Sequence, residues 1–265
     1  MNQVKAKKFL GQHFLKDLDI ARQIALTIPT CEPTSVLEVG PGMGVLTQFL
    51  LSNPLIDLTC VELDRESVVY LREHYPSLQL IEGDFLRLDL SKVFPRSFCL
   101  TGNYPYNISS QILFKALENK DRIPVITGMF QKEVAERVAS KPGKKAYGIL
   151  SVLLQAYYDV EYLFTVHEHV FDPPPKVKSA VILLTRNSTQ SLGCDESMFK
   201  TVVKTAFNQR RKTMRNSLRG LCNNDTALLS DPLFNLRPEQ LSVAQFVELT
   251  NLISRQHNAR QKCHS

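Results

Sequence analysis

The sequence contains no apolar run of the roughly 18 residues that a membrane span needs. Its N-terminal stretch is basic but has neither the apolar core nor the cleavage site of a signal peptide. Internal repeats and low-complexity segments are also missing. The six cysteines are widely spaced and form no C-x-x-C pair, which argues against a zinc site and against a disulfide framework. We therefore expect a cytoplasmic protein with reduced thiols and no metal ion.

Composition and charge indicate a soluble globular protein. The hydrophobic content of 43% and the charged content of 22% are ordinary for such a chain. The length of 265 residues suffices for one large domain, or for one domain with a smaller appendage. The formal net charge is +6 and the pI is near 9.0, which favours an anionic partner. Charge alone fits an ordinary basic protein equally well.

The hydrophobic pattern predicts an α/β fold. Apolar, β-branched runs alternate with helix-like stretches, and strands that are apolar throughout are typical of a parallel sheet with helices on both faces. The last two runs follow one another without a clear helix, which predicts an antiparallel hairpin at the sheet edge. The expected strands are 35–40, 57–64, 78–84, 98–105, 123–130, 151–158 and 178–185, and the expected helices are 44–52, 65–74, 108–118 and 131–139.

The composition changes after Arg186. Residues 187–197, NSTQSLGCDES, are typical of a linker. From residue 196 onward the pattern is helical, with Pro232 and Pro238 as breaks. We therefore expect an α/β domain over 1–186 and a small helical domain over 187–265.

A glycine-rich turn follows the first expected strand, in LEVGPGMG. Gly40, Gly42 and Gly44 permit a tight backbone and close approach of a ligand. Open α/β sheets bind ligands beyond the carboxyl ends of their strands. The third glycine comes one residue too early for the dinucleotide fingerprint G-x-G-x-x-G. By itself, the motif is also compatible with a purely structural turn.

Acidic residues end the next two strands. Glu62 is placed to accept hydrogen bonds from two ribose hydroxyls, and Asp84 to accept from an adenine amino group with Phe85 against the ring. Each acid alone could instead cap a helix, and Asp64 fits that role best. Taken in order, the three strand ends describe an adenosine pocket without a phosphate-binding lysine of the Walker type. This combination points to S-adenosylmethionine.

The fourth strand leads into the turn Asn103-Tyr104-Pro105-Tyr106. The adenine N6 amino group is a poor nucleophile because its lone pair is delocalised into the ring. Two acceptors on its hydrogens, the Asn103 side-chain oxygen and the Tyr104 backbone carbonyl, would favour attack on a methyl sulfonium. Pro105 would stiffen the turn, and Tyr106 would stack on a flipped base. A proline-containing turn without catalytic role is the alternative.

These motifs together resemble the ribosomal RNA adenine N6-dimethyltransferases, in particular the small-subunit class. The resemblance covers almost the whole chain and includes KKFLGQHFL (7–15), LEVGPGMG (37–44), EGDFL (82–86), GNYPYNIS (102–109), FDPPPKVKSAV (171–181) and AFNQRRKTMRNSL (206–218). It implies a Rossmann-like class I methyltransferase sheet with a small C-terminal all-α domain. With the residues singled out above, the expected cofactor contacts are Gln12, His13, Leu15, Gly40, Gly42, Glu62, Asp84, Phe85 and Asn103. Two positions depart from many members, His13 in place of Asn and Tyr104 in place of Leu.

The FDPPPKVKS segment has three consecutive prolines, which favour a stiff extended conformation. The resemblance implies that Phe171 stacks on the target adenine opposite Tyr106, at the rim of the pocket. Burial of Phe171 in the core is the alternative. Lys176 and Lys178 would then lie where RNA phosphates pass.

Residues 200–219 carry seven Lys or Arg and no acid, which favours phosphate contact over a merely solvated face. The i, i+4 spacing of Arg211, Arg215 and Arg219 predicts one face of a helix. The expected RNA-binding residues are Lys176, Lys178, Arg210, Arg211, Lys212, Arg215 and Arg219. His167 and His169 alternate, and we expect them on the outer face of a strand rather than in a metal site.

The expected function is S-adenosylmethionine-dependent N6,N6-dimethylation of two adjacent adenosines in a 3′-terminal hairpin of 16S rRNA, with a role in ribosome biogenesis. We expect a monomer that acts on the small subunit or its precursor. Two alternatives remain: a large-subunit rRNA methyltransferase of the macrolide-resistance type, and a non-catalytic assembly factor.

Overall fold

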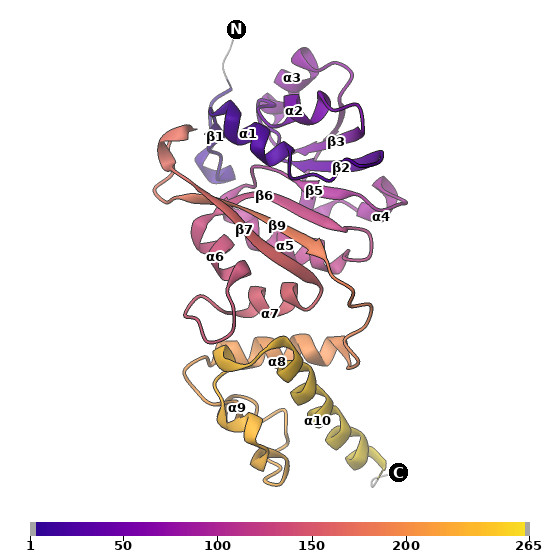
Figure 1. Ribbon diagram of the computed structural model, residues 1–265, viewed down its shortest axis with the longest axis vertical. Coiled ribbons are helices and arrows are strands. Elements are labelled where there is room, and N and C mark those ends of the chain that lie inside the picture. Colours follow the sequence, from indigo (N-terminus) through magenta and orange to yellow (C-terminus); the bar gives the residue numbers. More distant parts are fainter. Residues whose placement is uncertain (1–3, 263–265) are drawn as a thin grey trace. The chain divides into compact units, whose positions relative to one another are not determined.

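A computed structural model describes the backbone of residues 4–262 and the side chains of residues 4–257. The chain forms two compact units (Figure 1). The first comprises the residues up to Ala135 together with Asp159–Arg186, and the second comprises Glu136–Tyr158 together with the residues from Asn187 onward. The chain passes from the first unit to the second at residue 187, where the boundary was expected. Residues 136–158, however, group with the second unit rather than the first.

The first unit is built on a seven-stranded sheet with strand order β4-β3-β2-β5-β6-β9-β7 (Figure 1). Parallel pairs join β2 to β3 and β5, β3 to β4, and β5 to β6, whereas β9 runs antiparallel to β6. This confirms the predicted α/β fold with its antiparallel edge. The strands are β2 (Thr34–Val39), β3 (Ile56–Glu62), β4 (Gln79–Glu82), β5 (Cys99–Thr101), β6 (Val125–Gln131), β7 (Tyr158–Val166) and β9 (Ser179–Arg186).

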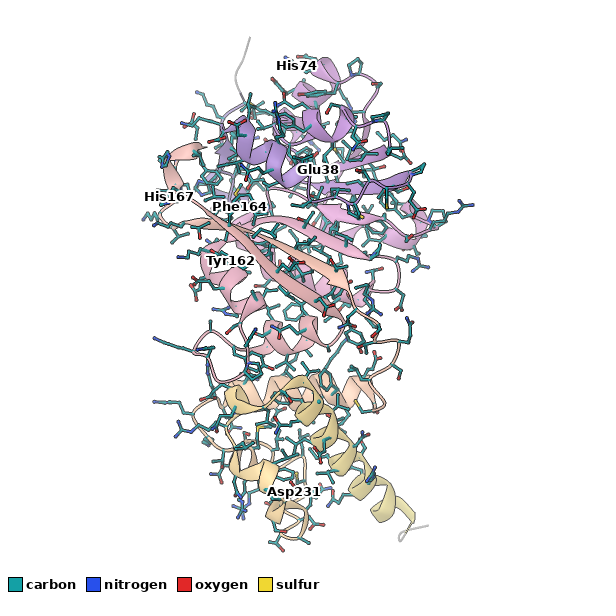
Figure 2. All side chains as sticks on the ribbon, in the orientation of Figure 1. Glu38, His74, Tyr162, Phe164, His167 and Asp231 are labelled. Carbon is teal, nitrogen blue, oxygen red and sulfur yellow. The ribbon has the colours of Figure 1, made fainter. Side chains whose placement is uncertain are left out.

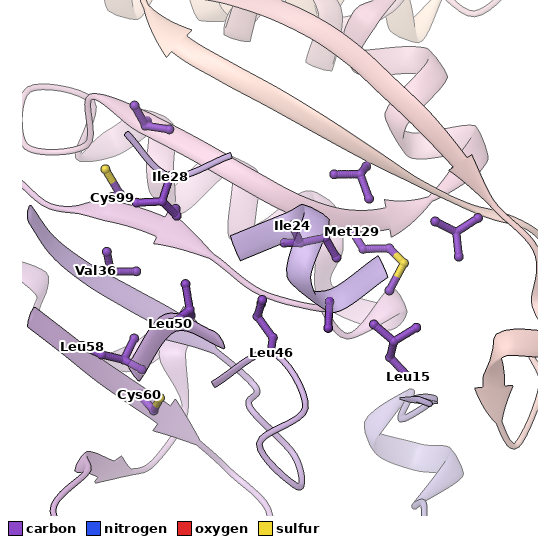
Figure 3. Packing of buried hydrophobic residues seen from close by; sticks show 14 of the residues in the cluster. Leu15, Ile24, Ile28, Val36, Leu46, Leu50, Leu58, Cys60, Cys99 and Met129 are labelled. Carbon is purple, nitrogen blue, oxygen red and sulfur yellow. The ribbon is translucent and has the colours of Figure 1, made fainter. Parts of the chain in front are cut away.

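Helices cover both faces of this sheet because its central strands are apolar on both sides. On one face, Ile24 packs with Leu46, Leu50 and Met129 in a buried cluster (Figure 3), and helix α5 lies on the other (Figure 1). The 10-residue helix predicted at 65–74 is present with those bounds. The helices of the first unit are α1 (Leu18–Ala25), α2 (Thr47–Leu51), α3 (Arg65–His74), α4 (Leu90–Val93) and α5 (Ser109–Glu118), and the chain passes from the first unit to the second within α6 (Lys132–Ala139).

The second unit is helical, as expected, but it also contains a segment predicted to be a strand. SVLLQAYY (151–158) belongs largely to helix α7, and the first strand of the edge hairpin is β7 instead. All residues from Leu150 to Leu154 are buried, so the run has no polar face, and periodicity does not separate a buried helix from a buried strand. The helices are α7 (Ile149–Gln155), α8 (Glu196–Asn208), α9 (Met214–Ser217) and α10 (Val243–Lys262).

The basic segment 200–219 is not one continuous helix. Helix α8 ends at Asn208 and α9 has only four residues, so Arg211, Arg215 and Arg219 do not share a single helical face. The buried stripe of α8 runs only to Ala206, and a helix without an apolar face to pack has little to stabilise it. Pro232 and Pro238 each begin a short 3-10 helix. Among the described residues, no helix is long and apolar enough to cross a membrane.

Candidate active site

A pocket in the first unit lies at the carboxyl ends of the parallel strands. Its walls come from the turn after β2, the end of β3, the loop after β4, the turn after β5 and the N-terminal segment. Every residue expected to bind the cofactor lines it, and so does the turn Asn103-Tyr104-Pro105-Tyr106. The expected residues lining it are Gln12, His13, Leu15, Gly40, Gly42, Glu62, Asp84, Phe85 and Asn103.

The carboxylate of Glu62 is oriented by the backbone around it. One oxygen accepts from the N–H of Gly42 at 3.0 Å and the other from the N–H of Asp64 at 2.8 Å. Burial raises the pKa of Glu62, and these backbone donors oppose that shift. Asp64 itself caps helix α3 by accepting from the N–H of Glu66, as predicted from the sequence.

The glycine turn allows the N-terminal segment to approach closely. Gly42 has φ 58°, a backbone conformation that residues other than glycine rarely adopt. A Cβ at this position would lie 2.9 Å from the Phe14 ring. Gly42 therefore provides both the turn and the space for the segment that lines the pocket.

Residues 7–15, which we call the N-terminal strap, are tied to the rest of the site at both ends. Lys7 forms ion pairs with Asp64 and Glu66. At the other end, strand β1 (Phe14–Leu15) pairs antiparallel with β8 (Phe171–Asp172). The strap therefore forms one wall of the pocket through contacts with segments distant in sequence.

The turn after β5 is held by the strap and by strand β6. The Asn103 amide nitrogen donates to the carbonyl oxygen of His13 at 3.0 Å, which leaves the amide oxygen as the acceptor of that side chain. The Tyr104 N–H donates to the carbonyl of Met129 at 3.1 Å. The Tyr104 hydroxyl donates to the carbonyl of Thr127 at 2.9 Å. Its buried side chain therefore anchors the turn, and only its backbone is available for chemistry.

Tyr106 is half-buried beside the pocket. Its hydroxyl forms a hydrogen bond with Ser179 Oγ, and its ring centroid lies 5.3 Å from that of His13. His13 Nδ1 is 2.8 Å from the carbonyl oxygen of Pro173. The FDPPPKVKS segment, through Pro173 and Ser179, therefore supports both rings.

Phe171 does not lie at the rim of the pocket, contrary to the expectation from the sequence. Its side chain is 1% exposed and belongs to the same buried hydrophobic cluster as Ile24 and Met129. Phe171 is the register partner of Leu15, which is also buried, whereas the following Asp172 is exposed. Side chains alternate along a strand, so this pairing turns Phe171 inward.

Glu38 is a pocket residue that the sequence analysis missed (Figure 2). It is 1% exposed on β2 and accepts from Thr47 Oγ1 at 2.7 Å and from Cys60 Sγ at 3.5 Å. Burial raises the pKa of its carboxyl to about 7. An acidic residue inside the apolar strand SVLEV is the signal that would have identified it.

The charge of the pocket has one sign. Three carboxyl groups line it, those of Glu38, Glu62 and Asp84, and no Lys or Arg is among its described lining residues. Such a pocket disfavours a pyrophosphate and favours a ligand that carries positive charge.

The basic residues expected to contact RNA differ in their surroundings. In the first unit, Lys176 and Lys178 are exposed. In the second unit, Arg210 is half-buried, donates to the carbonyl of Lys144 and lies 3.9 Å from Glu239. The exposed members of this unit are Arg211, Lys212, Arg215 and Arg219.

The two histidines do not lie on the face of a strand. His167 follows β7 (Figure 2) and His169 lies in a short 3-10 helix (Glu168–Val170), with ring centroids 5.9 Å apart. Within the described residues, no group of three or more His, Cys, Asp or Glu could hold a metal ion.

Comparison with solved structures identifies the same fold. A dimethyladenosine transferase from Plasmodium falciparum has a TM-score of 0.75 at 24% identity, over 92% of this chain and 98% of that one. The 23S rRNA methyltransferase ErmE has a TM-score of 0.67 at 26% identity, over 90% and 99% of the two chains. The structure is therefore a methyltransferase fold.

Sequence comparison is more specific. A family model described as ribosomal RNA adenine dimethylase matches residues 3–255. The ribosomal RNA small subunit methyltransferase A of Parabacteroides distasonis is 65% identical over 263 residues, 98% of each chain. The protein of that name from Porphyromonas gingivalis is 59% identical over 257 residues, 96% of this chain and 99% of that one. The resemblance inferred from the motifs is confirmed, and the chain belongs to the ribosomal RNA adenine dimethylase family.

Proposed function

We propose that this protein converts two adjacent adenosines in a 3′-terminal hairpin of 16S rRNA to N6,N6-dimethyladenosine during small-subunit biogenesis. The observation that carries the proposal is a pocket that three carboxyl groups and the turn Asn103-Tyr104-Pro105-Tyr106 line, with no Lys or Arg among its described lining residues. Family membership and the names of the relatives support the rRNA substrate.

The proposed methyl donor is S-adenosylmethionine, whose sulfonium supplies an electrophilic methyl group. The pocket fits this donor because it offers carboxylates to a cation and no described Lys or Arg to a phosphate. Glu62, already oriented by two backbone donors, would accept from the ribose hydroxyls. Asp84 would accept from the adenine amino group, and Phe85 would pack against the ring.

The turn after β5 would orient the amino group of the target adenine. Because the Asn103 nitrogen is engaged by His13, its oxygen is the atom left to accept one amino hydrogen. The Tyr104 carbonyl would accept the other, held by the anchored Tyr104 side chain. The attacking nitrogen loses a proton to water once it has become an ammonium, so this scheme needs no strong general base. Catalysis then consists of positioning and hydrogen bonding.

The target base would stack on Tyr106, whose ring is fixed by Ser179. Lys176 and Lys178 beside this site, and the exposed basic residues of the second unit, would contact RNA phosphates. We further propose that the protein acts as a monomer in the cytoplasm, on the small subunit or its precursor.

Methyl transfer from labelled S-adenosylmethionine to unmethylated small subunits tests this function, with large subunits and naked DNA as controls. Digestion of the RNA should yield N6,N6-dimethyladenosine at two adjacent small-subunit positions. Label confined to large-subunit RNA would instead assign the activity of the ErmE-like class, which shares the fold.

An Asn103→Ala variant separates catalysis from particle binding. We expect methyl transfer to fall by roughly 10²- to 10³-fold, the range for loss of one preorganised hydrogen-bonding group, while binding to the small subunit is retained. A wild-type protein that binds small subunits but never methylates them would establish the non-catalytic assembly factor instead.

A further inference from the structure

A lysine outside the lining of the pocket holds the loop that follows β4. Lys115 lies on α5, and its ammonium donates to the carbonyl oxygens of Leu86 at 2.9 Å and Leu88 at 2.6 Å. Both carbonyls belong to the segment that directly follows Asp84 and Phe85. One ammonium therefore restrains two points of a short loop, and hydrogen bonds to a charged donor are stronger than neutral ones.

The same ammonium contacts the aromatic residue of this loop. It lies 5.4 Å from the centroid of the Phe85 ring, within the range of a cation–π interaction. Phe85 is 4% exposed and lines the pocket. The loop has its own internal bonds, from Leu86 N–H to Asp84 Oδ1 at 2.9 Å and from Leu88 N–H to the Phe85 carbonyl at 3.2 Å. Lys115 adds the contacts that fix the loop to a helix.

Helix α5 also supports the turn proposed to act in catalysis. It begins three residues after Tyr106, following a 3-10 helix (Tyr106–Ile108), and its first residue, Ser109, donates from Oγ to the Pro105 carbonyl at 3.0 Å. Six residues further along the helix, Lys115 reaches the loop after β4. The two loops on either side of the pocket are therefore attached to one rigid element.

We propose that Lys115 is a positioning residue that holds Asp84 and Phe85 in the arrangement required by the adenine of the methyl donor. The inference rests on the proposed function, because it assigns Asp84 and Phe85 to that adenine. Lys115 acts through the loop and does not itself line the pocket.

Lys92 provides a matched control. It lies on α4 in the same unit, with a side chain that is 83% exposed and an ion pair to Asp89 at 3.5 Å. Lys92→Met removes the same charge and the same side chain as Lys115→Met, but none of the contacts to the loop. Differences between the two variants therefore report on those contacts rather than on net charge.

Calorimetric binding of S-adenosylhomocysteine to the ligand-free variants tests the proposal. We expect Lys115→Met to raise the Kd by roughly 10-fold, as for the loss of a hydrogen bond to a charged group, and Lys92→Met to leave it unchanged. The same titration with S-inosylhomocysteine, which lacks the exocyclic amino group, measures the contribution of Asp84. Wild type and Lys92→Met should prefer the adenine compound, and Lys115→Met should lose most of that preference.

Hydrogen exchange of the ligand-free protein gives a second readout. Backbone amides of residues 85–88 should exchange faster in Lys115→Met than in Lys92→Met, while amides of β5 remain protected. Lys115→Gln keeps two hydrogen-bond donors but removes the charge, and it too should raise the Kd and speed exchange of the amides of residues 85–88. It replaces Lys115→Met if that variant does not fold. Unchanged affinity, adenine preference and exchange in either variant would overturn the proposal. Failure of the wild-type protein to bind S-adenosylhomocysteine would instead refute the proposed function.

Discussion

Gly128 on the interior strand β6 is the residue whose substitution should damage the site most directly from outside the pocket. It has φ 135°, a region that other residues enter at a cost of about 1–3 kcal/mol. A Cβ there would lie 2.7 Å from Cε2 of Tyr104 and closer still to the Gly102 carbonyl oxygen. Overpacking of this kind costs typically about 1–3 kcal/mol more. Gly128→Ala should therefore destabilise the protein by about 2–6 kcal/mol.

Substitutions of two other glycines in the first unit separate the cost of backbone strain from the cost of steric overlap. Gly40 has φ 69° but only ordinary contacts at 3.6 Å, and Gly83 has neither a positive φ nor a neighbour within 4 Å. We expect Gly40→Ala to cost about 1–3 kcal/mol, from backbone strain alone. We expect Gly83→Ala to change the free energy of unfolding by less than about 0.5 kcal/mol.

Urea denaturation of the ligand-free variants, followed by far-ultraviolet circular dichroism, measures these differences. The sequence contains no tryptophan, so a tryptophan fluorescence signal is not available. Methyl transfer by folded Gly128→Ala should also fall, because the added methyl group displaces the turn that contains Tyr104. A loss of stability no greater than that of Gly40→Ala would refute the argument from overlap.

Three further predictions concern other parts of the chain. The Glu38 pKa of about 7 lies above the ordinary value of 4.5 for such a carboxyl. The folded state therefore keeps a proton that the unfolded state releases, and stability falls as the pH rises from about 4.5 to about 7. Glu38→Gln should abolish that decline, up to about 3 kcal/mol, and an unchanged pH profile of urea midpoints would contradict it. Tyr104→Phe removes the hydrogen bond to the Thr127 carbonyl and should lower the free energy of unfolding by about 1 kcal/mol. Its kcat in methyl-transfer assays should be unchanged. Arg211→Ala should weaken particle binding and its salt dependence more than Arg210→Ala, as filter binding at several salt concentrations would establish.

The sequence predicts the sheet and the pocket well because their signals are local. A parallel strand buried on both faces is a continuous apolar run, and the pocket residues that come from the sheet lie mostly at or just after the ends of such runs. Once the strands are aligned, Gly40, Glu62, Asp84 and Asn103 meet at one edge of the sheet. The prediction fails for α7, where a run buried on every side looks the same in a helix and a strand.

Contacts between distant segments were not predictable from the pattern. Phe171 turns inward because β8 pairs with β1 in a particular register, and nothing in FDPPPKVKS encodes that partner. Lys115 belongs to an ordinary amphipathic helix by its spacing, and its role depends on where the loop after β4 passes. Arg210 stands in a run of like charges, yet it lies beside an acid nearly thirty residues later, Glu239.

The pairing of the N-terminal strap has a consequence for the biosynthesis of the protein. The strap is translated before the rest of the first unit, but its partner strand β8, and Ser179 that holds Tyr106, come near the end of that unit. The walls of the pocket that depend on these contacts cannot close until that part of the chain has left the ribosome. The nascent protein therefore has the pocket residues at the ends of β2 and β3 before the pocket is complete. Activity should arise only late in chain elongation.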